Sequence, residues 1–507
     1  MKIKCFFVGV ALLLVESSSI YAQKQLTMDE AIEISIERSP ELKKSALNLD
    51  RYQNLLNAQK ASLKSKFALN INPFEYSNKR SFDNRLSEWY TNESLSSSGT
   101  LSITQPIVWT NTTISLNNKF GWQNNNSTID GSGTTNNNQA FSNSLYLRLN
   151  QPLFSYNKYK LELESIEMDY ENATISYALT RLRLEQQITS QFYAVYMAQN
   201  NLGISKEELE NAQQNYDIIK EKVQLDLVPR SELFQAELNL STAESSLENS
   251  TVSLESAKDK FKVILGLPLN EDVSTYAQIE ENSVYVDANM AIEHALTNRL
   301  ELRQREITDK LSEFSLTQIK DNGKFKGNIA LSVGIMGDNR DLRNVYESPT
   351  SSPTVAISFS VPIFDWGARR DRINAQKIKM EMEQIDKEQE LIDIEIDVVK
   401  TCRNLKNLVL QIEIAKKSVE NAQQTYDLNS EKYRAGEITG MEMNQFQSQL
   451  SSQKISLAQK MVNYKIELLN LKVISLYDFE NNKPISPMLM YGTESMIEYQ
   501  KYKNKKK

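Results

Sequence analysis

A large apolar residue recurs at every seventh position over 188–223, and the same pattern returns 210 residues later over 398–433. A seven-residue apolar repeat of this length predicts a helix that packs along its whole length against neighbouring helices, as in a coiled coil. The amino-acid sequence itself also repeats, because NAQQNYDIIKEKV at 211–223 aligns with NAQQTYDLNSEKY at 421–433. The chain is therefore an internal duplication built on very long helices. The positions of these packing seams are Ile188, Val195, Leu202, Leu209, Tyr216, Val223, Val398, Leu405, Ile412, Val419, Tyr426 and Tyr433.

The duplication extends beyond the long helices, but the two copies are not aligned at one constant offset. MAIEHALTNRLEL at 290–302 matches DEAIEISIERSPEL at 29–42 with an offset of 260 residues, whereas VPIF at 361–364 matches QPLF at 151–154 with an offset of 210. The two offsets differ by 50 residues. The first copy therefore carries an insertion of about that size between its N-terminal helices and its long helix.

The insertion lies in a region where the apolar period changes from helical to two. Alternating apolar and polar residues predict strands with one apolar and one polar face, which fit a soluble sandwich or a membrane barrel. The long helices and an N-terminal export signal favour the barrel. The polar stretches 77–98 and 123–140 are expected to be loops, and 109–112 a tight turn. The predicted strands are 67–76, 99–108, 112–122 and 141–154 in the first copy, and 326–336 and 353–364 in the second.

The N-terminus has the three parts of a secretory signal peptide. Lys2 and Lys4 form a basic start, Phe6 to Val15 form an apolar core, and Ala22 precedes the expected cleavage before Gln23. This apolar core is shorter than the roughly 20 residues that a membrane-spanning helix needs. No later segment is apolar enough to form such a helix, so we expect an exported protein whose insertion into a membrane would have to use strands.

Composition argues against several classes of function. The net charge of −7 over 507 residues predicts no nucleic-acid partner. Cys5 lies in the leader, so Cys402 has no disulfide partner in the mature chain, and with His294 as the single histidine no Cys/His metal site is expected. No set of nucleophile, base and orienting group is visible in the sequence. We therefore expect neither an enzyme nor a cofactor.

These patterns predict the organisation of the whole chain. The signal peptide covers 1–22 and a polar tail covers 477–507, and a linker at 270–288 joins the two copies. Each copy has N-terminal helices, then a strand block, then a long helical hairpin. These parts are 23–66, 67–154 and 155–269 in the first copy, and 289–325, 326–364 and 365–476 in the second.

Four motifs recur at equivalent places in the two copies. QPLFSYNKYKLE at 151–162 and VPIFDWGARR at 361–370 stand at the junctions between strand and helix, and DLVPRSELFQAE at 226–237 and AGEITGMEMNQF at 435–446 stand at the hairpin tips. In these motifs, and in the order of its elements behind a signal peptide, the chain resembles the TolC family of outer-membrane efflux proteins. The resemblance covers essentially the whole mature chain.

The resemblance implies a mainly α-helical fold with membrane β-strands. Three copies would join their strands into one β-barrel in the outer membrane of a Gram-negative bacterium, in contact with lipid, and a periplasmic α-helical barrel would continue it. The implied function is a passive channel-tunnel of a tripartite efflux or type I secretion system, with a periplasmic adaptor protein and an inner-membrane transporter as partners. A simple porin and a helical structural or adhesin protein at the cell surface are the alternatives.

Members of the family carry an acidic residue shortly after the glycine of the second hairpin turn, where it lines the periplasmic aperture. Glu442 follows Gly436 by six residues, and Glu232 occupies the equivalent place in the first copy. Well-known members have a second acid at the place of Gln445 and an arginine at the place of Ile438. As first-turn carboxylates, both glutamates also fit a purely structural role at a helix N-terminus. The aperture candidates are Glu232, Gln235, Glu442 and Gln445, and the candidate adaptor contacts are Leu227, Val228, Pro229, Arg230, Gly436, Glu437, Ile438 and Thr439.

Two expectations about assembly remain open to test by structure. The packing seams are expected to hold the three copies together. Six strands per copy would give 18 in the barrel, whereas the family's usual twelve would remain if 99–122 lay outside it.

Overall fold

The computed structural model describes residues 24–84, 87–129, 133–277 and 284–485, so the predicted signal peptide lies outside the described residues. The chain divides into two compact units. One unit, here the helical unit, comprises the described residues of 1–44, 178–298 and 394–507; the other, here the sheet unit, comprises those of 45–177 and 299–393.

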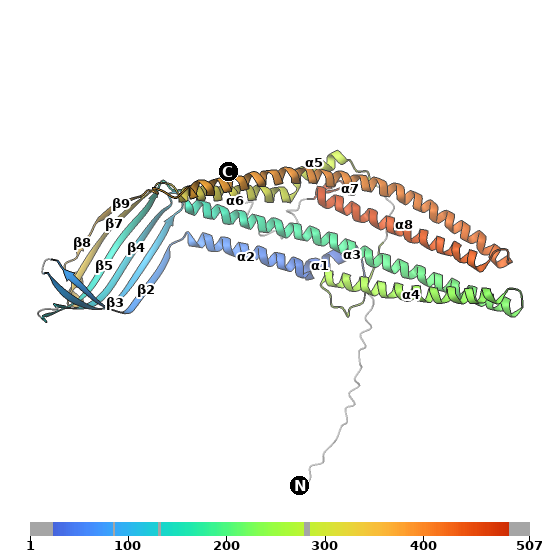
Figure 1. The fold of residues 1–507 in the computed structure, drawn as a ribbon, viewed down its shortest axis with the longest axis horizontal. Coiled ribbons are helices and arrows are strands. Elements are labelled where there is room, and N and C mark those ends of the chain that lie inside the picture. The colour runs from blue at the N-terminus through green and yellow to red at the C-terminus, as the bar shows by residue number, and fades with distance from the viewer. Residues whose placement is uncertain (1–23, 85–86, 130–132, 278–283, 486–507) are drawn as a thin grey trace, which may run out of the picture. The chain divides into compact units, whose positions relative to one another are not determined.

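The helices repeat in both order and length, which confirms the duplication (Figure 1). The two long helices have 67 and 68 residues, because no proline interrupts them before the hairpin turns and the single glycine, Gly203 in α3, lies inside a continuous apolar seam. The equivalent pairs are α1 (Met28–Arg38) and α5 (Ala288–Asn298) with 11 residues each, α2 (Pro40–Ser62) and α6 (Leu300–Asn322) with 23 each, α3 (Lys158–Gln224) and α7 (Ala368–Ala435), and α4 (Arg230–Leu265) and α8 (Gly440–Ser475) with 36 each.

All six predicted strands are present, and they form one antiparallel sheet in the sheet unit (Figure 1). The alternative that leaves 99–122 outside the sheet is wrong, because β3 and β4 pair with each other between β2 and β5. The short strand β8 (Thr350–Ser351) pairs with β7 on the same side as β9. Pro353 separates β8 from β9, because proline has no N–H to donate to the ladder. In spatial order the main strands are β2 (Lys66–Asp83), β3 (Glu88–Ile107), β4 (Thr112–Ile129), β5 (Thr135–Leu153), β7 (Lys326–Asn339) and β9 (Thr354–Ser360).

The expected loops at 77–98 and 123–140 are mostly strand instead. β2 and β3 stay paired as far as Asp83 and Glu88, and β4 and β5 as far as Thr128 and Thr135. The prediction failed because polar residues dominate both faces of these extensions, and the few apolar ones, such as Phe82, Trp89 and Leu95, are too widely spaced to give an alternation. Their ladders are completed by polar cross-strand contacts, such as the amide of Asn137 donating to Asn126 at 2.7 Å. The tight turn expected at 109–112 is confirmed, since β3 ends and β4 begins there.

In the half of the sheet that is next to the helices, one face is apolar and the other is polar. Residues directly opposite each other on neighbouring strands point to the same face. One such row is entirely apolar across five strands, and the row of residues shifted by one position is polar. The apolar row is Phe67, Ile103, Leu116, Leu147 and Val333, and the polar row is Lys66, Thr104, Ser115, Arg148, Ser332 and Thr354.

The apolar face of the sheet is widely exposed. Phe67 is 71% exposed and Val355 is 71% exposed, although both are large apolar residues. A soluble monomer rarely exposes so continuous an apolar surface. The apolar face therefore needs an apolar environment outside the single chain.

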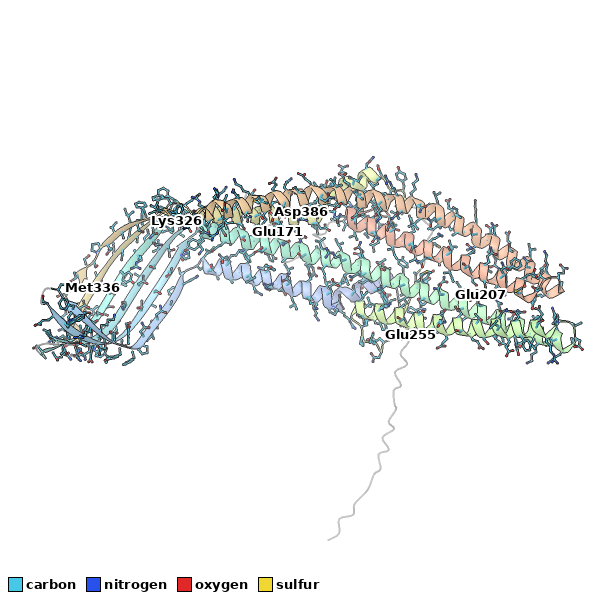
Figure 2. The ribbon with its side chains drawn as sticks, in the orientation of Figure 1. Glu171, Glu207, Glu255, Lys326, Met336 and Asp386 are labelled. Atoms are coloured by element: carbon cyan, nitrogen blue, oxygen red, sulfur yellow. The ribbon has the colours of Figure 1, made fainter. Side chains whose placement is uncertain are left out.

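Ion pairs join the helices of the sheet unit. Arg303 on α6 binds Glu171 on α3 through two hydrogen bonds of 2.7 and 3.2 Å, and Lys387 on α7 binds Asp309 on α6 at 3.1 Å. Because guanidinium and carboxylate groups match in planar geometry, the paired bonds fix the register of α6 against α3. Figure 2 labels Glu171 within this region.

The core of the helical unit lies where the N-terminal helices of each copy meet the hairpins. Short strands β1 (Lys24–Leu26) and β6 (Val273–Thr275) pair in parallel, and Phe192 on α3 packs against Phe261 on α4. Gly266 ends α4 with a φ of +70°, and a Cβ there would stand 2.6 Å from the carbonyl oxygen of Arg38. Only glycine fits so close an approach, so it fixes the contact between α4 and the end of α1. His294 on α5 stacks on the ring of Tyr477 at 4.5 Å between centroids.

The residues of the packing seams are buried or half-buried within the single chain. Ile188, Val195, Val398, Leu405 and Tyr433 are buried, and the other seven seam residues are half-buried. Five seam residues are thus covered by helices of the same chain, and the role of the seams between copies stays a prediction.

Candidate functional site

The two hairpin turns have the same backbone hydrogen bonds at an offset of 210 residues. In the first turn the amide of Leu227 donates to the carbonyl of Lys222 at 2.9 Å; in the second, Glu437 donates to Lys432 at the same distance. The residue before each donor adopts a left-handed conformation, with a φ of 53° at Asp226 and 80° at Gly436. This is the Schellman ending of a helix, which satisfies its last carbonyl groups and reverses the chain.

The two helices that follow the turns begin differently. Thr439 caps α8, since its hydroxyl accepts from the amide of Glu442 at 3.3 Å while the Glu442 carboxylate accepts from the amide of Thr439 at 2.8 Å. These bonds hold the pKa of Glu442 below its usual value, because the backbone amide of Thr439 stabilises the charged carboxylate. Pro229 stands at the equivalent place before α4 and makes no side-chain cap. The carboxylate of Glu232 therefore has no capping role.

The tips of the two hairpins pack against each other around Tyr433. Its side chain is buried in a small core with Ile219, Ala236 and Met443, which takes one residue from each of the four hairpin helices. Its hydroxyl donates to the amide oxygen of Asn215 on α3, and the ammonium of Lys222 lies 5.4 Å from its ring centroid.

Glu232 also belongs to this cluster. A Cβ built on Gly440 would lie 3.9 Å from the Glu232 carboxylate and 3.8 Å from the Tyr433 hydroxyl, so both groups lie close to this glycine. The pKa of Tyr433 is raised by burial and, to a lesser extent, by the negative charge of Glu232. We call Asn215, Lys222, Glu232 and Tyr433 the tip clasp.

The structure separates the four aperture candidates from one another. Glu232 lies in the tip clasp, while Glu442 is used as a helix cap. Gln235 is exposed and donates to Asn239 on its own helix at 3.1 Å, and Gln445 is exposed as well. The equivalence of Glu232 and Glu442 in sequence therefore does not extend to their contacts.

Sequence reasoning missed Asn215 and Lys222 as members of the clasp. Asn215 has threonine at the equivalent place in the second copy, Thr425, and that difference inside otherwise matching segments was the available signal. Tyr433 was identified as a seam residue, but nothing in its local sequence indicates that its hydroxyl reaches the other hairpin.

The apolar residues at the two tips differ in exposure. Leu225 and Leu227 are 69% and 68% exposed, so the first turn presents two large apolar side chains to its surroundings. Val228 and Ile438 are half-buried, and Ile438 packs against the tip core. At the second tip Met441, in the first turn of α8, is 65% exposed. Both tips therefore present apolar surface.

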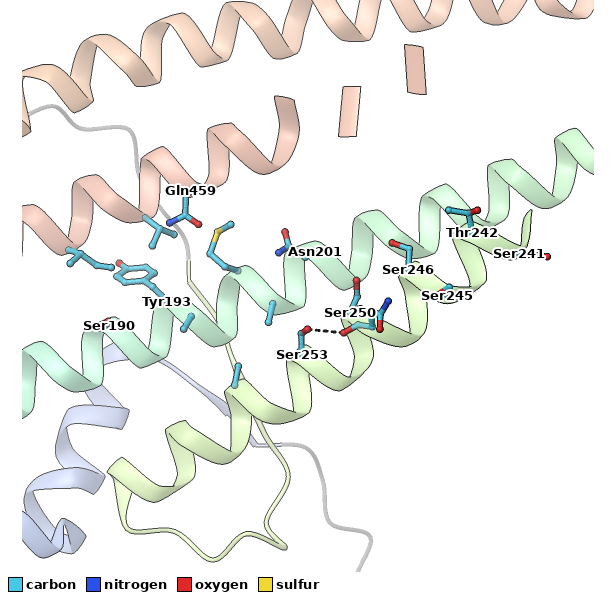
Figure 3. A pocket seen from close by; sticks show the side chains of 17 residues that line it. Ser190, Tyr193, Asn201, Ser241, Thr242, Ser245, Ser246, Ser250, Ser253 and Gln459 are labelled. Carbon is cyan, nitrogen blue, oxygen red and sulfur yellow. Dashed lines mark hydrogen bonds between the residues drawn. The ribbon is translucent and has the colours of Figure 1, made fainter. Parts of the chain in front are cut away.

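The helical unit also has a groove between α3, α4 and α8 (Figure 3). This groove has a volume of about 970 Å³ and is lined on α4 mainly by serine side chains, including Ser246 and Ser253. Ser253 uses its hydroxyl locally, donating to the carbonyl of Asn249 at 2.7 Å. Burial raises the pKa of Tyr193, at the α3 side of the groove, to about 12. Small side chains of this kind permit close approach of a helix.

The helices also carry a second apolar stripe that faces away from the seams. The stripe is formed by residues more than half exposed, which no part of the described chain covers. Its members in the helical unit are Phe234, Leu238, Val252 and Val263 on α4, and Ile396, Leu410, Ile414 and Leu428 on α7.

The described residues contain no helix with an apolar stretch long enough to cross a bilayer. Over the same residues, no three His, Cys, Asp or Glu side chains gather where they could hold a metal ion.

Comparison with known proteins gives matches in sequence and in structure. Residues 328–475 match the family described as outer membrane efflux protein. Nodulation protein T of Rhizobium leguminosarum bv. trifolii is 21% identical over 334 residues, which cover 64% of this chain and 70% of that protein.

Two solved structures share the fold. The CmeC outer membrane channel of Campylobacter jejuni superposes with a TM-score of 0.68 at 16% identity, covering 93% of this chain and 88% of that one. The outer membrane protein VceC of Vibrio cholerae does so with a TM-score of 0.63 at 13% identity, covering 88% and 95%. The family is one of membrane channels and not of enzymes. With its duplicated helices, its amphipathic sheet and these matches, the chain is similar to outer membrane efflux proteins in sequence over 328–475 and shares the fold of outer membrane channels.

Proposed function

We propose that three copies of this chain form one passive conduit through the outer membrane and the periplasm. The conduit carries substrates from an inner-membrane transporter and its periplasmic adaptor to the exterior. The observation that carries the proposal is the amphipathic six-stranded sheet, whose apolar face is exposed and whose two edge strands have a partner on one side only among the described residues.

The two edges account for the joining of copies into a closed ring, and the number of copies sets the size of the pore. Lipid cannot satisfy the backbone groups of an open edge, so β2 of one copy has to pair with β9 of the next until the sheet closes. Three sheets of six strands then make an 18-stranded barrel, a size that leaves an aqueous channel. The apolar face would contact lipid and the polar face would line the channel.

The exposed helix stripes provide the contact between copies in the periplasm. The α4 stripe of one copy would pack against the α7 stripe of the next, burying large apolar side chains that the single chain leaves exposed. Closing the ring in this way removes apolar surface from water on every copy, at roughly 25 cal/mol per Å².

The tip clasp fits the role of a gate at the periplasmic end. It joins the α3–α4 hairpin to the α7–α8 hairpin through Tyr433 and Asn215. The conduit would widen when these two hairpins part, which exposes Tyr433. Leu225 and Leu227 at the first turn would contact the adaptor, because they are exposed and apolar.

The alternatives account for fewer of these features. A simple porin needs the sheet but has no use for two 36-residue return helices that meet in a buried clasp. A helical adhesin needs the helices but not a sheet with an exposed apolar face.

The proposal is tested by breaking the contact between copies while sparing the seams. Ile414→Asp places a charge on the α7 stripe, and we expect it to abolish the trimer and export, since each copy would bury an unpaired charge at a cost of several kcal/mol. Lys406→Asp, at an exposed position off the stripe, is the matched control and should leave the trimer intact. Trimers are scored by cross-linking in outer-membrane extracts. Stable trimers of Ile414→Asp, with normal export, would contradict the proposed helix contact.

A further inference from the structure

In the half of the sheet next to the helices, the polar face carries three basic side chains that no described carboxylate pairs with. Lys66, Lys119 and Arg148 are exposed, lie on β2, β4 and β5, and make no ion pair among the described contacts of the sheet. Lys326 on β7 is different, because the carboxylate of Asp321 binds its ammonium at 3.1 Å. Figure 2 marks Lys326 near one end of β7 and Met336 farther along the same strand.

Cross-strand register places these cations in two rows of the same face. Lys66 and Arg148 share one row, in which every other member is a serine or a threonine: Thr104, Ser115, Ser332 and Thr354. Lys119 lies two rows higher, between Thr100 and Ser144. With strand residues rising about 3.4 Å each, the two rows are roughly 14 Å apart.

Acidic residues are absent from these rows and from the row between them, over residues that are all described. The intermediate row consists of uncharged residues, Ala68, Ser102, Asn117, Tyr146 and Gly334. The first carboxylate along this face, Asp338, lies in the next row above, two strands from Lys119. This zone therefore has a net positive charge of three in each copy.

The row that contains Arg148 suits oxyanions because of its hydrogen-bond donors as well as its charge. The guanidinium carbon of Arg148 lies 5.2 Å from the ring centroid of Tyr146, which supports the side chain against the sheet. Guanidinium, ammonium and hydroxyl groups all donate hydrogen bonds, and carboxylate, phosphate and sulfate groups accept them. Rings of Arg and Lys select anions in other pores for this reason.

We propose that the channel is selective for anions and that its substrates are anionic solutes, with Lys66, Arg148 and Lys119 as the residues that determine this selectivity. The inference rests on the proposed function, because it requires that the polar face line a pore. In the trimer the three basic zones form one positively charged belt, which concentrates anions locally and repels cations.

The test is the reversal potential of purified full-length trimers in planar bilayers across a tenfold KCl gradient. We expect chloride to permeate better than potassium. Because mobile ions screen exposed charges, with a Debye length of about 10 Å at 0.1 M and 3 Å at 1 M, the preference should weaken as total salt rises. Replacing Lys66, Lys119 and Arg148 together by Gln should lower the chloride-to-potassium permeability ratio by about threefold or more.

Arg80→Gln is the matched control, because Arg80 lies on the opposite face, where its guanidinium stacks on Trp89 at 4.9 Å. It should leave the ratio unchanged, and trimer formation is checked for every variant. Currents that prefer potassium in the unmodified protein, or a ratio that the triple variant does not change, would overturn the inference while leaving the conduit intact. If neither the unmodified trimer nor a Tyr433→Ala trimer with loosened tips conducts, the pore assignment fails and the inference fails with it.

Discussion

The turn after α3 and the turn after α7 share their backbone hydrogen bonds, but equivalent glutamates beside them have different contacts. Glu442 completes the cap of α8 with Thr439, whereas Glu232 has no cap to make and lies beside Tyr433. The difference follows from one residue, since Pro229 has no side-chain acceptor where the second copy has Thr439. The two copies thus share the backbone of the turn, and where the cap is absent the carboxylate lies at the contact between hairpins.

Removing the ring of Tyr433 should have the largest effect on the tips. Tyr433→Ala deletes a buried aromatic side chain and the bond to Asn215, and large-to-small changes of this kind cost about 3–5 kcal/mol. We expect faster hydrogen exchange at both tips and a larger conductance in planar bilayers. Val223→Ala, at the equivalent place in the first copy, is the control and should have a much smaller effect, because Val223 is only half-buried. Equal effects of the two variants would show that the clasp has no special role.

Restoring the missing cap should convert the first tip into a copy of the second. Pro229→Thr creates the spacing Thr-x-x-Glu with Glu232, which favours a capping box worth about 1 kcal/mol. We expect the carboxylate to turn from Tyr433 toward the new cap, so that the pKa of Tyr433 falls toward its ordinary value. The titration of Tyr433 can be followed by its ultraviolet absorbance or by NMR. An unchanged tyrosine pKa would mean that the cap and the clasp do not compete for Glu232.

The left-handed residue of each turn offers a smaller test. A Cβ on Gly436 would meet nothing within 4 Å, so Gly436→Ala should cost only the backbone penalty of about 1–2 kcal/mol. Asp226→Gly should remove a comparable but smaller strain from the first turn, because aspartate tolerates this conformation better than alanine does. Proteolysis rates at the two tips measure both effects. A stabilising Gly436→Ala would contradict the assigned backbone geometry.

The pH dependence of the second tip should be the smallest effect. The pKa of Glu442 is lowered in the folded chain, so its contribution is present above the unfolded pKa, near 4.5, and is lost as the pH falls through the folded value. We expect the first turn of α8 to loosen in hydrogen exchange on acidification below about pH 4.5, and the first turn of α4 to change less. In Glu442→Gln the extra loosening of α8 should disappear. Persistence of that loosening would assign it to another group.

Segments with a regular spacing of apolar residues could be predicted from the sequence, and segments without one could not. The helices α3 and α7 could be bounded closely, because a seven-residue seam marks their second halves and the strand-to-helix motifs mark their starts. The outer halves of β2 to β5 could not, because polar residues dominate both faces there and the few apolar ones are too widely spaced to give an alternation. The tip clasp was equally hidden, since Asn215 and Tyr433 are 218 residues apart and only tertiary packing brings them together. What the sequence did indicate was the place of the turns, through Pro229 and Gly436.

The most direct test of the proposed assembly joins the two edges of the sheet. Leu69 on β2 and Ile357 on β9 are 63% and 59% exposed, lie on the apolar face, and stand at opposite edges of the sheet in one chain. Cysteines at both positions, in a Cys402→Ser background, should form disulfides between copies on oxidation in the outer membrane. We predict covalently linked dimers and closed trimers on denaturing gels, and no cross-linked species with more than three copies. Exclusive formation of monomers with an internal disulfide would mean that the six strands close on themselves, and would contradict the trimeric channel.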